Sequence, residues 1–425
     1  MGTSPQDLID FLEASPSPAH CVAEAAARLE AAGFQRCEED DLPGEIAPGY
    51  RGYLSRGGTL VAWIAGNEAP DTAGFRILGA HTDSPNLRLK PVAEYAKEGY
   101  LQWGLEVYGS PILATWTDRD LGLAGSVTCL VDGKLVQRLV RVDEPIARIP
   151  NVAIHYNREA NSSGLKLNAQ KHLPAVVSQG EPGELMALLA QAADCEQEAI
   201  KGWDLGLFDL QAPRLGGLND EFVFSARLDN QFSCYTALQG LLEQTSPADS
   251  TSVLALFDHE EVGSQSATGA RSMFLELVLS RLIRDHQSPP QGGLARAVGR
   301  SFMVSSDMAH GVHPNYADYH DPQHKPKLNG GPVLKSNASL SYATDGEAAA
   351  RFRLACESAG VPSQDHIHRT DLRCGSTVGP IVAAGLAIRT VDVGAAMLSM
   401  HSIREQAGAH DVEMLTHVFT QILMG

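Results

Sequence analysis

The chain has 425 residues, of which 44% are hydrophobic and 20% charged, and its 33 Lys and Arg against 51 Asp and Glu give a formal net charge of −18. Because a groove that follows phosphates needs a basic stripe, this charge balance argues against a nucleic-acid partner. No segment approaches the roughly 18 uninterrupted apolar residues of a membrane span, so we expect no membrane partner either.

The first acidic residues of the chain, Asp7, Asp10 and Glu13, come before any Lys or Arg, which is the reverse of the order in a secretory signal. The seven cysteines are odd in number, scattered, and never spaced C-x-x-C. This usage indicates reduced thiols rather than a disulfide framework or a cysteine zinc site. We therefore expect a cytoplasmic protein.

In chain order, two helices come first, because Ser-Pro pairs at 4–5 and 17–18 place a cap and a first-turn proline before helical sequence, and the second helix stops at Gly33. Apolar runs at 59–64 and 75–80 predict buried strands. From about 91 to 218 the pattern changes, and runs at 126–131 and 135–140 flank an Asp-Gly-Lys turn typical of a β-hairpin. This segment is predicted to be a separate β-rich domain.

The alternation of strand and helix returns after residue 218. Short apolar runs at 253–257, 302–305 and 387–391 have the length of buried strands, and the segments 230–242, 346–359 and 411–424 read as helices. We predict an α/β domain with a mixed sheet, made from residues 1–90 and 219–425 and interrupted by an inserted β-rich domain at 91–218.

Histidines and carboxylates follow the predicted strands, and ligands bind at the carboxyl edge of α/β sheets. The set comprises His81, Asp83, Asp229, Asp258, His259, Glu260, Glu261, Asp307, His310 and His401. Several carboxylates on one edge would repel one another unless a cation held them. His with Asp or Glu, without Cys, suits a catalytic zinc site, and two metals bridged by one carboxylate are the usual hydrolytic version.

Each of these residues also has a simpler interpretation. His81 could be a loop histidine, Glu260 and Glu261 a solvated acidic pair, and Asp229 the N-cap of the helix at 230–242. The histidines at 310, 313, 320 and 324 read as a loop of surface or packing residues. Because these residues occur together at strand ends and turns, the pattern favours the metal site.

The segments 79–85 (Gly-Ala-His-Thr-Asp-Ser-Pro), 258–264 (Asp-His-Glu-Glu-Val-Gly-Ser) and 305–315 closely resemble the aspartyl aminopeptidase family of co-catalytic zinc exopeptidases. The resemblance covers nearly the full length, including the inserted domain and the segment Met-His-Ser-Ile-Arg-Glu at 400–405. It implies two zinc ions per subunit, with Mn or Co possible at one site, and a homo-oligomer that is a hollow dodecamer assembled through the inserted domain.

By this resemblance, His81 and Asp307 bind one zinc, Glu261 and His401 bind the other, and Asp229 bridges both. Glu260 is the general base, and Asp83 orients His81 from behind. The substrate-contacting residues are His155, His310, Lys335 and Tyr342, with His155 reaching the active site of a neighbouring subunit. Without the resemblance, His155 could be a strand-end histidine with a backbone partner or a metal ligand beside His81 and His401, and Lys335 a solvated surface lysine.

The sequence therefore predicts a zinc aminopeptidase that removes unblocked N-terminal Asp or Glu from peptides. A related dinuclear zinc exopeptidase or deacylase of other specificity is one alternative. A non-catalytic peptide-binding shell is a second, although a scaffold has no reason to keep a base beside a metal ligand.

Overall fold

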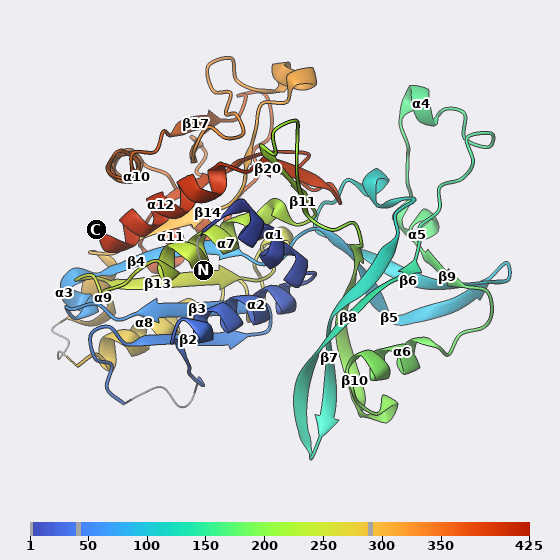
Figure 1. Cartoon of the computed structure of the whole chain (residues 1–425), viewed down its shortest axis with the longest axis horizontal. Coiled ribbons are helices and arrows are strands. Elements are labelled where there is room, and N and C mark those ends of the chain that lie inside the picture. The colour runs from blue at the N-terminus through green and yellow to red at the C-terminus, as the bar shows by residue number, and fades with distance from the viewer. Residues whose placement is uncertain (1–2, 40–43, 288–291) are drawn as a thin grey trace. The chain divides into compact units, whose positions relative to one another are not determined.

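The computed structural model describes residues 3–39, 44–287 and 292–425 (Figure 1). The chain divides into two compact units, of which the first comprises Met1–Asp83, Pro213–Met400 and Glu405–Gly425. The second comprises Ser84–Ala212 and the short stretch His401–Arg404. These borders lie a few residues from the predicted ones at 90 and 218, and 401–404 is assigned to the unit that carries the insertion.

A nine-stranded mixed sheet forms the centre of the first unit. Its strands, in spatial order, are β1 (Gln35–Arg36), β2 (Arg51–Arg56), β3 (Thr59–Ile64), β13 (Thr251–Phe257), β4 (Phe75–His81), β14 (Phe302–Ser306), β18 (Arg389–Gly394), β16 (Val333–Ser336) and β17 (Gln364–Ile367). The central strands β13, β4, β14 and β18 run parallel, whereas β3 and β16 pair antiparallel with β13 and β18. The predicted mixed α/β fold is confirmed.

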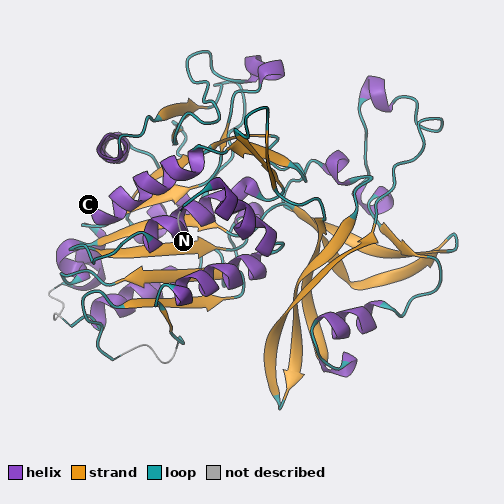
Figure 2. Cartoon of the chain, in the orientation of Figure 1, coloured by secondary structure: helices purple, strands orange, loops and turns teal. Residues whose placement is uncertain are grey.

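Both faces of this sheet are apolar and covered by helices (Figure 2). Alternate residues of β3 point to opposite faces, so Leu60 and Ala62 enter one core while Val61 and Trp63 enter the other. The first core is packed by α1 (Pro5–Ala14), α2 (Pro18–Ala31), α7 (Leu228–Leu242), α10 (Gly346–Ala359) and α12 (Asp411–Met424). The second is packed by α8 (Phe274–Arg284), α9 (Gly293–Val298) and α11 (Val378–Leu386).

The predicted helix starts are confirmed in their caps. The Ser4 hydroxyl accepts a hydrogen bond from the amide of Asp7, and the Ser17 hydroxyl accepts one from His20. In each helix a proline occupies the first turn, where its missing N–H costs no hydrogen bond.

A smaller five-stranded sheet also belongs to the first unit. Its order is β11 (Arg214–Gly216), β12 (Phe222–Ser225), β20 (Glu405–Gly408), β19 (Ala396–Leu398) and β15 (Ala309–His310). Short helices complete the unit: α3 (Pro70–Ala73), η3 (Glu260–Val262) and η4 (Pro314–Tyr319). The sheet positions His310 and the chain that leads into α7.

The second unit is built on a six-stranded antiparallel sheet. Its order is β8 (Lys134–Ala147), β7 (Leu121–Val131), β10 (Ile200–Asp209), β5 (Asn86–Lys97), β6 (Tyr100–Tyr108) and β9 (Ala175–Ser178). The short helices are η1 (Leu113–Trp116), α4 (Ala160–Ser163), α5 (Ala169–His172), α6 (Leu185–Ala192) and η2 (Gln197–Ala199). The predicted β-hairpin is formed by β7 and β8, and its turn lies at Asp132-Gly133, where both residues have positive φ.

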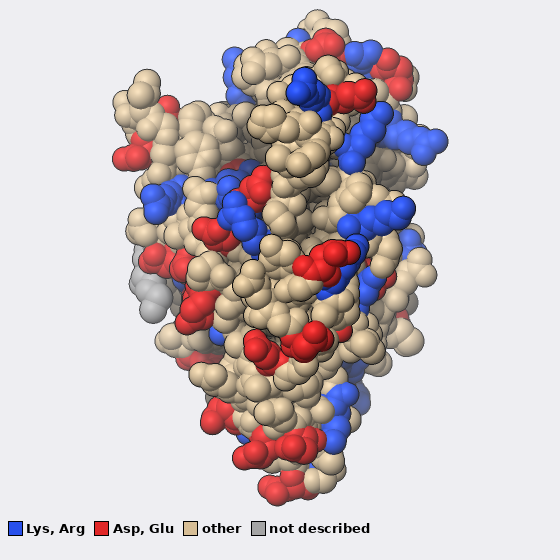
Figure 3. All heavy atoms as spheres, turned by 90° about the vertical axis from the view of Figure 1, so that its right-hand side faces the viewer, with Lys and Arg blue, Asp and Glu red and all other residues tan. Residues whose placement is uncertain are grey.

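The distribution of charged side chains on the surface agrees with the acidic composition of the chain. Acidic and basic side chains are interspersed on the face seen in Figure 3, where no basic stripe crosses the surface. None of the described helices is both long and apolar enough to cross a bilayer.

Candidate metal centre

The candidate centre lies where three adjacent strands of the nine-stranded sheet end. The strands β13, β4 and β14 are neighbours and run parallel, so their carboxyl ends meet at one edge. His81 is the last residue of β4, Glu260 and Glu261 form η3 soon after β13, and Asp307 follows β14 directly. Residues more than 200 positions apart in the chain are thereby brought to one place, as the strand-end pattern predicts.

His81 occupies the middle of this group and is 1% exposed. Its Nε2 lies 3.5 Å from Oδ1 of Asp229 and 3.6 Å from Oδ1 of Asp307. Its Nδ1 lies 3.0 Å from the carbonyl oxygen of Asp83 and 3.4 Å from that residue's carboxylate. One ring nitrogen is thus oriented by Asp83 while the other faces two acidic side chains.

Asp83 also fixes the backbone of the two adjacent glutamates. Its Oδ1 accepts a hydrogen bond from the amide of Glu260, and its Oδ2 accepts one from the amide of Glu261, both at 3.1 Å. A single fully buried carboxylate therefore contacts both the His81 ring and the turn that carries Glu260 and Glu261. This connection is absent from the sequence pattern.

Asp229 enters the site from the start of α7. Its backbone is extended (φ −83°, ψ 102°), its peptide bond to Asn230 is cis, and its amide donates to Oε2 of Glu405 at 3.1 Å. Its carboxylate belongs to the group of described residues whose ligand atoms all lie within 4.8 Å of one another, namely His81, Asp229 and Glu261. The position thus supports the metal-site interpretation over a simple helix cap.

Lys335 lies beside this group, on β16. It is 2% exposed, and its Nζ donates to the carbonyl oxygens of Asp307 (2.7 Å) and Met308 (3.3 Å). The same Nζ lies 3.8 Å from Oδ2 of Asp307 and 5.1 Å from the ring centroid of Tyr342, itself buried. The interpretation of Lys335 as a solvated surface lysine is therefore wrong.

The pKa values reflect this concentration of charge. Burial lowers the pKa of His81, but the carboxylates of Asp229, Asp307 and Asp83 overcome burial and hold the pKa well above its ordinary value. Burial raises the pKa of Glu260 to about 9; His81 opposes this rise, while Asp307 and Glu261 add to it. A divalent cation would lower both pKa values, because it favours deprotonated ligands.

The donor set fits a catalytic metal. One imidazole and several carboxylates converge with no cysteine among them, which suits zinc in a catalytic rather than a structural role. A cation would also offset the repulsion among Asp229, Glu261 and Asp307. Such a centre, beside the additional carboxylate of Glu260, is that of a metallohydrolase.

Two predicted residues, His155 and His401, belong to the second unit. His155 lies in an exposed turn, and no hydrogen bond to it occurs among the described residues, so it is not a strand-end histidine with a backbone partner. The Nδ1 of His401 lies 3.0 Å from the carbonyl oxygen of Ser110. Their predicted roles towards substrate and metal stay predictions.

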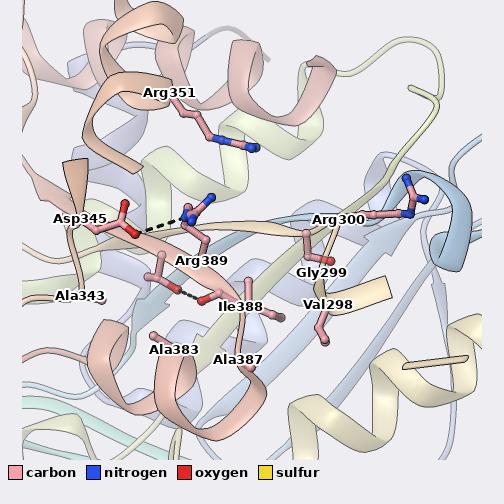
Figure 4. Close-up of a pocket in the computed structure, with 12 residues that line it drawn as sticks. Val298, Gly299, Arg300, Ala343, Asp345, Arg351, Ala383, Ala387, Ile388 and Arg389 are labelled. Carbon is pink, nitrogen blue, oxygen red and sulfur yellow. Dashed lines mark hydrogen bonds and ion pairs between the residues drawn. The ribbon is translucent and has the colours of Figure 1, made fainter. Parts of the chain in front are cut away.

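A separate pocket of about 480 Å³ lies at the opposite, amino-terminal ends of β14 and β18 (Figure 4). Arg300, Arg351 and Arg389 line it, and Arg389 forms a 3.3 Å ion pair with Asp345. None of the predicted site residues lines this pocket.

Comparison with known proteins identifies the family. Residues 11–422 match the family described as "Aminopeptidase I zinc metalloprotease (M18)". The "Probable M18 family aminopeptidase 2" of Pseudomonas putida (strain GB-1) is 49% identical over 421 residues, which cover 97% of this chain and 96% of that protein. The chain belongs to the M18 family of metallo-aminopeptidases.

Solved structures agree with this assignment. The structure titled "Cryo-EM structure of the Ape4 and Nbr1 complex" is similar with a TM-score of 0.94 and 36% identity, covering 99% of this chain and 85% of that one. The S. cerevisiae mApe1 dodecamer has a TM-score of 0.86 and 28% identity, covering 98% and 95%.

Sequence reasoning missed several residues that the structure places in or near the site. Glu405 bonds the Asp229 amide, and His366 and His368 lie near His310. The His-Ile-His spacing at 366–368 was a signal in the sequence, because alternate residues of a strand share a face. The histidines at 310 and 320 are thus part of a cluster rather than separate surface residues.

Proposed function

We propose that this M18 aminopeptidase uses two zinc ions to remove unblocked N-terminal Asp or Glu from peptides. The observation that carries the proposal is the convergence of His81, Asp229 and Glu261 within 4.8 Å. Asp307 beside His81 supplies a further carboxylate. In this proposal His81 and Asp307 would hold one ion, Glu261 and His401 would hold the other, and Asp229 would be shared by both; Mn or Co could replace zinc at one site.

When bound, the ions supply a water that ionises near neutral pH and a Lewis acid for the scissile carbonyl. Glu260 would be the residue that takes up a proton from the attacking water and gives it to the nitrogen of the leaving amine. Asp83 holds the amides of Glu260 and Glu261 and the ring of His81, so that base and ligands keep a fixed relation. Burial raises the pKa of Glu260, and the bound cations would lower it again towards the range in which the carboxylate can accept a proton.

The acidic specificity rests on Lys335. The chain carries a net charge of −18, which repels an acidic substrate, so a local cation is needed to bind its side chain. Lys335 is a buried ammonium next to the centre, with Tyr342 against it, and His310 lies in the same region. We assign these three residues to the substrate's terminal residue.

We further propose a homo-oligomer, a dodecamer as in the related S. cerevisiae mApe1 structure. In the second unit Val152, Ile154 and Tyr156 are 56%, 48% and 87% exposed around His155. Large apolar side chains exposed together are typical of an interaction surface. We assign this turn to an intersubunit contact through which His155 enters a neighbouring active site.

Two experiments test these assignments. Turnover of Asp-, Glu-, Leu- and Lys-chromogens by zinc-loaded protein should favour the first two, and equal rates on all four would favour an exopeptidase of broad specificity. No turnover of any peptide would favour a binding shell. Co-assembled Glu260→Gln and His155→Ala chains should regain activity, because some sites then contain both native residues; verified mixed particles that stay inactive would contradict the shared site.

A further inference from the structure

Four histidines form a cluster in the first unit beside Lys335. His310 lies on β15, His320 follows η4, and His366 and His368 lie on and just after β17. The ring centroids of His310 and His368, and of His366 and His368, are 5.5 Å apart. The His310 and His366 centroids are 6.0 Å apart, and those of His320 and His366 are 6.2 Å apart.

The strand pairing explains why the rings meet. β17 is the edge strand of the nine-stranded sheet, and His366 is in register with Lys335 on the parallel strand β16. On its other side, residue 368 forms a β-bridge with residue 320. His366 and His368 are two positions apart and so face the same side of the strand.

Three ring nitrogens of this cluster lack hydrogen-bond partners. His366 is 3% exposed, and neither its Nδ1 nor its Nε2 has a hydrogen-bond partner; the buried Nδ1 of His368 has none either. A buried polar atom without a hydrogen-bond partner destabilises the fold. Three such atoms on two neighbouring rings therefore call for an ion or water molecules between them.

The ring spacing fits a metal ion. With Zn–N distances of about 2.0–2.1 Å, tetrahedral coordination places imidazole centroids about 5 Å apart. The ring centroids of His310, His366 and His368 lie within about 1 Å of that spacing, but their nitrogens do not lie within 4.8 Å of one another as the rings are oriented, so a metal would bind only after the rings rotate. We propose that these three histidines, with His320 beside His366 as a further donor, form a second metal-binding site for zinc or another late first-row transition ion.

The charge state of the rings agrees with this assignment. Burial lowers the pKa of His366 to about 3 and that of His310 to about 4, and neighbouring histidines and Lys335 add to both effects. The imidazoles are thus neutral at pH 7, the form that binds metal. Because the ammonium of Lys335 opposes a cation here, the site binds zinc more weakly than the catalytic centre does.

Occupation of this site has a consequence that rests on the proposed function. His310 is assigned to the substrate there, so a metal that holds its ring withdraws it from the substrate. Zinc in excess of what the catalytic centre needs therefore inhibits hydrolysis of Asp and Glu substrates. Chelation of the excess restores activity.

Zinc stoichiometry tests the site directly. Wild-type protein and the variants His366→Phe, His368→Asn and His417→Gln are equilibrated with excess zinc, freed of unbound metal, and analysed by elemental mass spectrometry. His417 is an exposed histidine on α12 and serves as the control. We expect wild type and His417→Gln to hold one zinc per chain more than the other two variants do.

Thermal unfolding confirms that all four proteins are folded. If they then hold equal amounts of zinc, the proposed metal site is wrong, and water molecules occupy the space between the histidines. Inhibition by excess zinc should disappear in His366→Phe and His368→Asn; its persistence would overturn the regulatory role. A zinc difference without hydrolysis of acidic substrates would instead refute the proposed function and leave the second site standing.

Discussion

The Nζ of Lys335 lies 3.8 Å from one oxygen of the Asp307 carboxylate, while the other oxygen of Asp307 lies 3.6 Å from Nε2 of His81. Asp307 is thus placed between the candidate metal centre and the only cation that we assign to substrate recognition. A change at Lys335 therefore acts on specificity and, through Asp307, on the centre itself.

Replacement of Lys335 by Met should lower kcat/KM for Asp and Glu substrates selectively. Loss of a buried, charge-assisted contact worth about 1.5–3 kcal/mol corresponds to roughly 10–150-fold. The measurement is the ratio of kcat/KM for an Asp substrate to that for a Leu substrate, because any loss through Asp307 affects both equally. An unchanged ratio would show that Lys335 supports the site without reading the acidic group.

Replacement of Glu260 by Gln should reduce turnover roughly 10²–10⁴-fold, because the amide cannot accept the water's proton. Zinc content should stay at the wild-type value, since Glu260 is not assigned as a ligand. Elemental analysis beside steady-state kinetics checks both points. If Glu260→Gln loses zinc while Glu261→Gln retains it, Glu260 is the metal ligand and Glu261 is the general base.

Replacement of Asp229 by Ala should remove more zinc than His81→Ala or His401→Ala does. A bridging carboxylate neutralises both ions, whereas each histidine serves one. Metal analysis after dialysis against a weak chelator separates the three variants. Two zinc ions retained by the Asp229 variant would contradict the bridging role.

Replacement of Asp83 by Asn should weaken zinc binding or activity by about 10–100-fold, the range found when a residue that orients a metal ligand is lost. The Asn oxygen can accept only one of the two bonds from Glu260 and Glu261, and its amide group points a donor at the other N–H. Competition with a chromogenic chelator measures the zinc affinity of the variant. Circular dichroism checks that the variant is folded like the wild type. The control Thr82→Val removes a neighbouring hydroxyl that bonds only backbone carbonyls of Gly58 and Phe257 and should change zinc affinity far less.

Local signals were sufficient for much of the fold. Ser4 and Ser17 predicted two helix starts, and the apolar runs at 59–64 and 253–257 predicted buried strands, because caps and burial depend on near neighbours in sequence. The start of β18 was predicted at 387, yet Ala387 has positive φ at the end of α11 and the strand begins at Arg389. Apolarity alone does not distinguish the end of a buried helix from the start of a strand.

The candidate site was predictable in part for a similar reason. His81 ends a strand, and Glu261 and Asp307 come after strands, so their positions in the chain indicated a common edge of the sheet. The burial of Lys335 and the grouping of His366 with His310 depend on how β16, β17 and β15 are arranged in space, and no local pattern carries that information. The hydrogen bonds from the amides of Glu260 and Glu261 to Asp83 likewise depend on the position of the turn after β13, which no local sequence pattern predicts.

The position of β4 has a consequence for how the chain is made. Its neighbours on both sides, β13 and β14, are encoded after the insertion, so a ribosome has produced the strand Phe75–His81 long before either partner exists. During that interval a largely apolar strand has both edges unpaired, the state in which nascent chains associate wrongly. Synthesis that stalls between residues 84 and 250 would therefore release chains that cannot complete the central sheet and that depend on chaperones to remain apart.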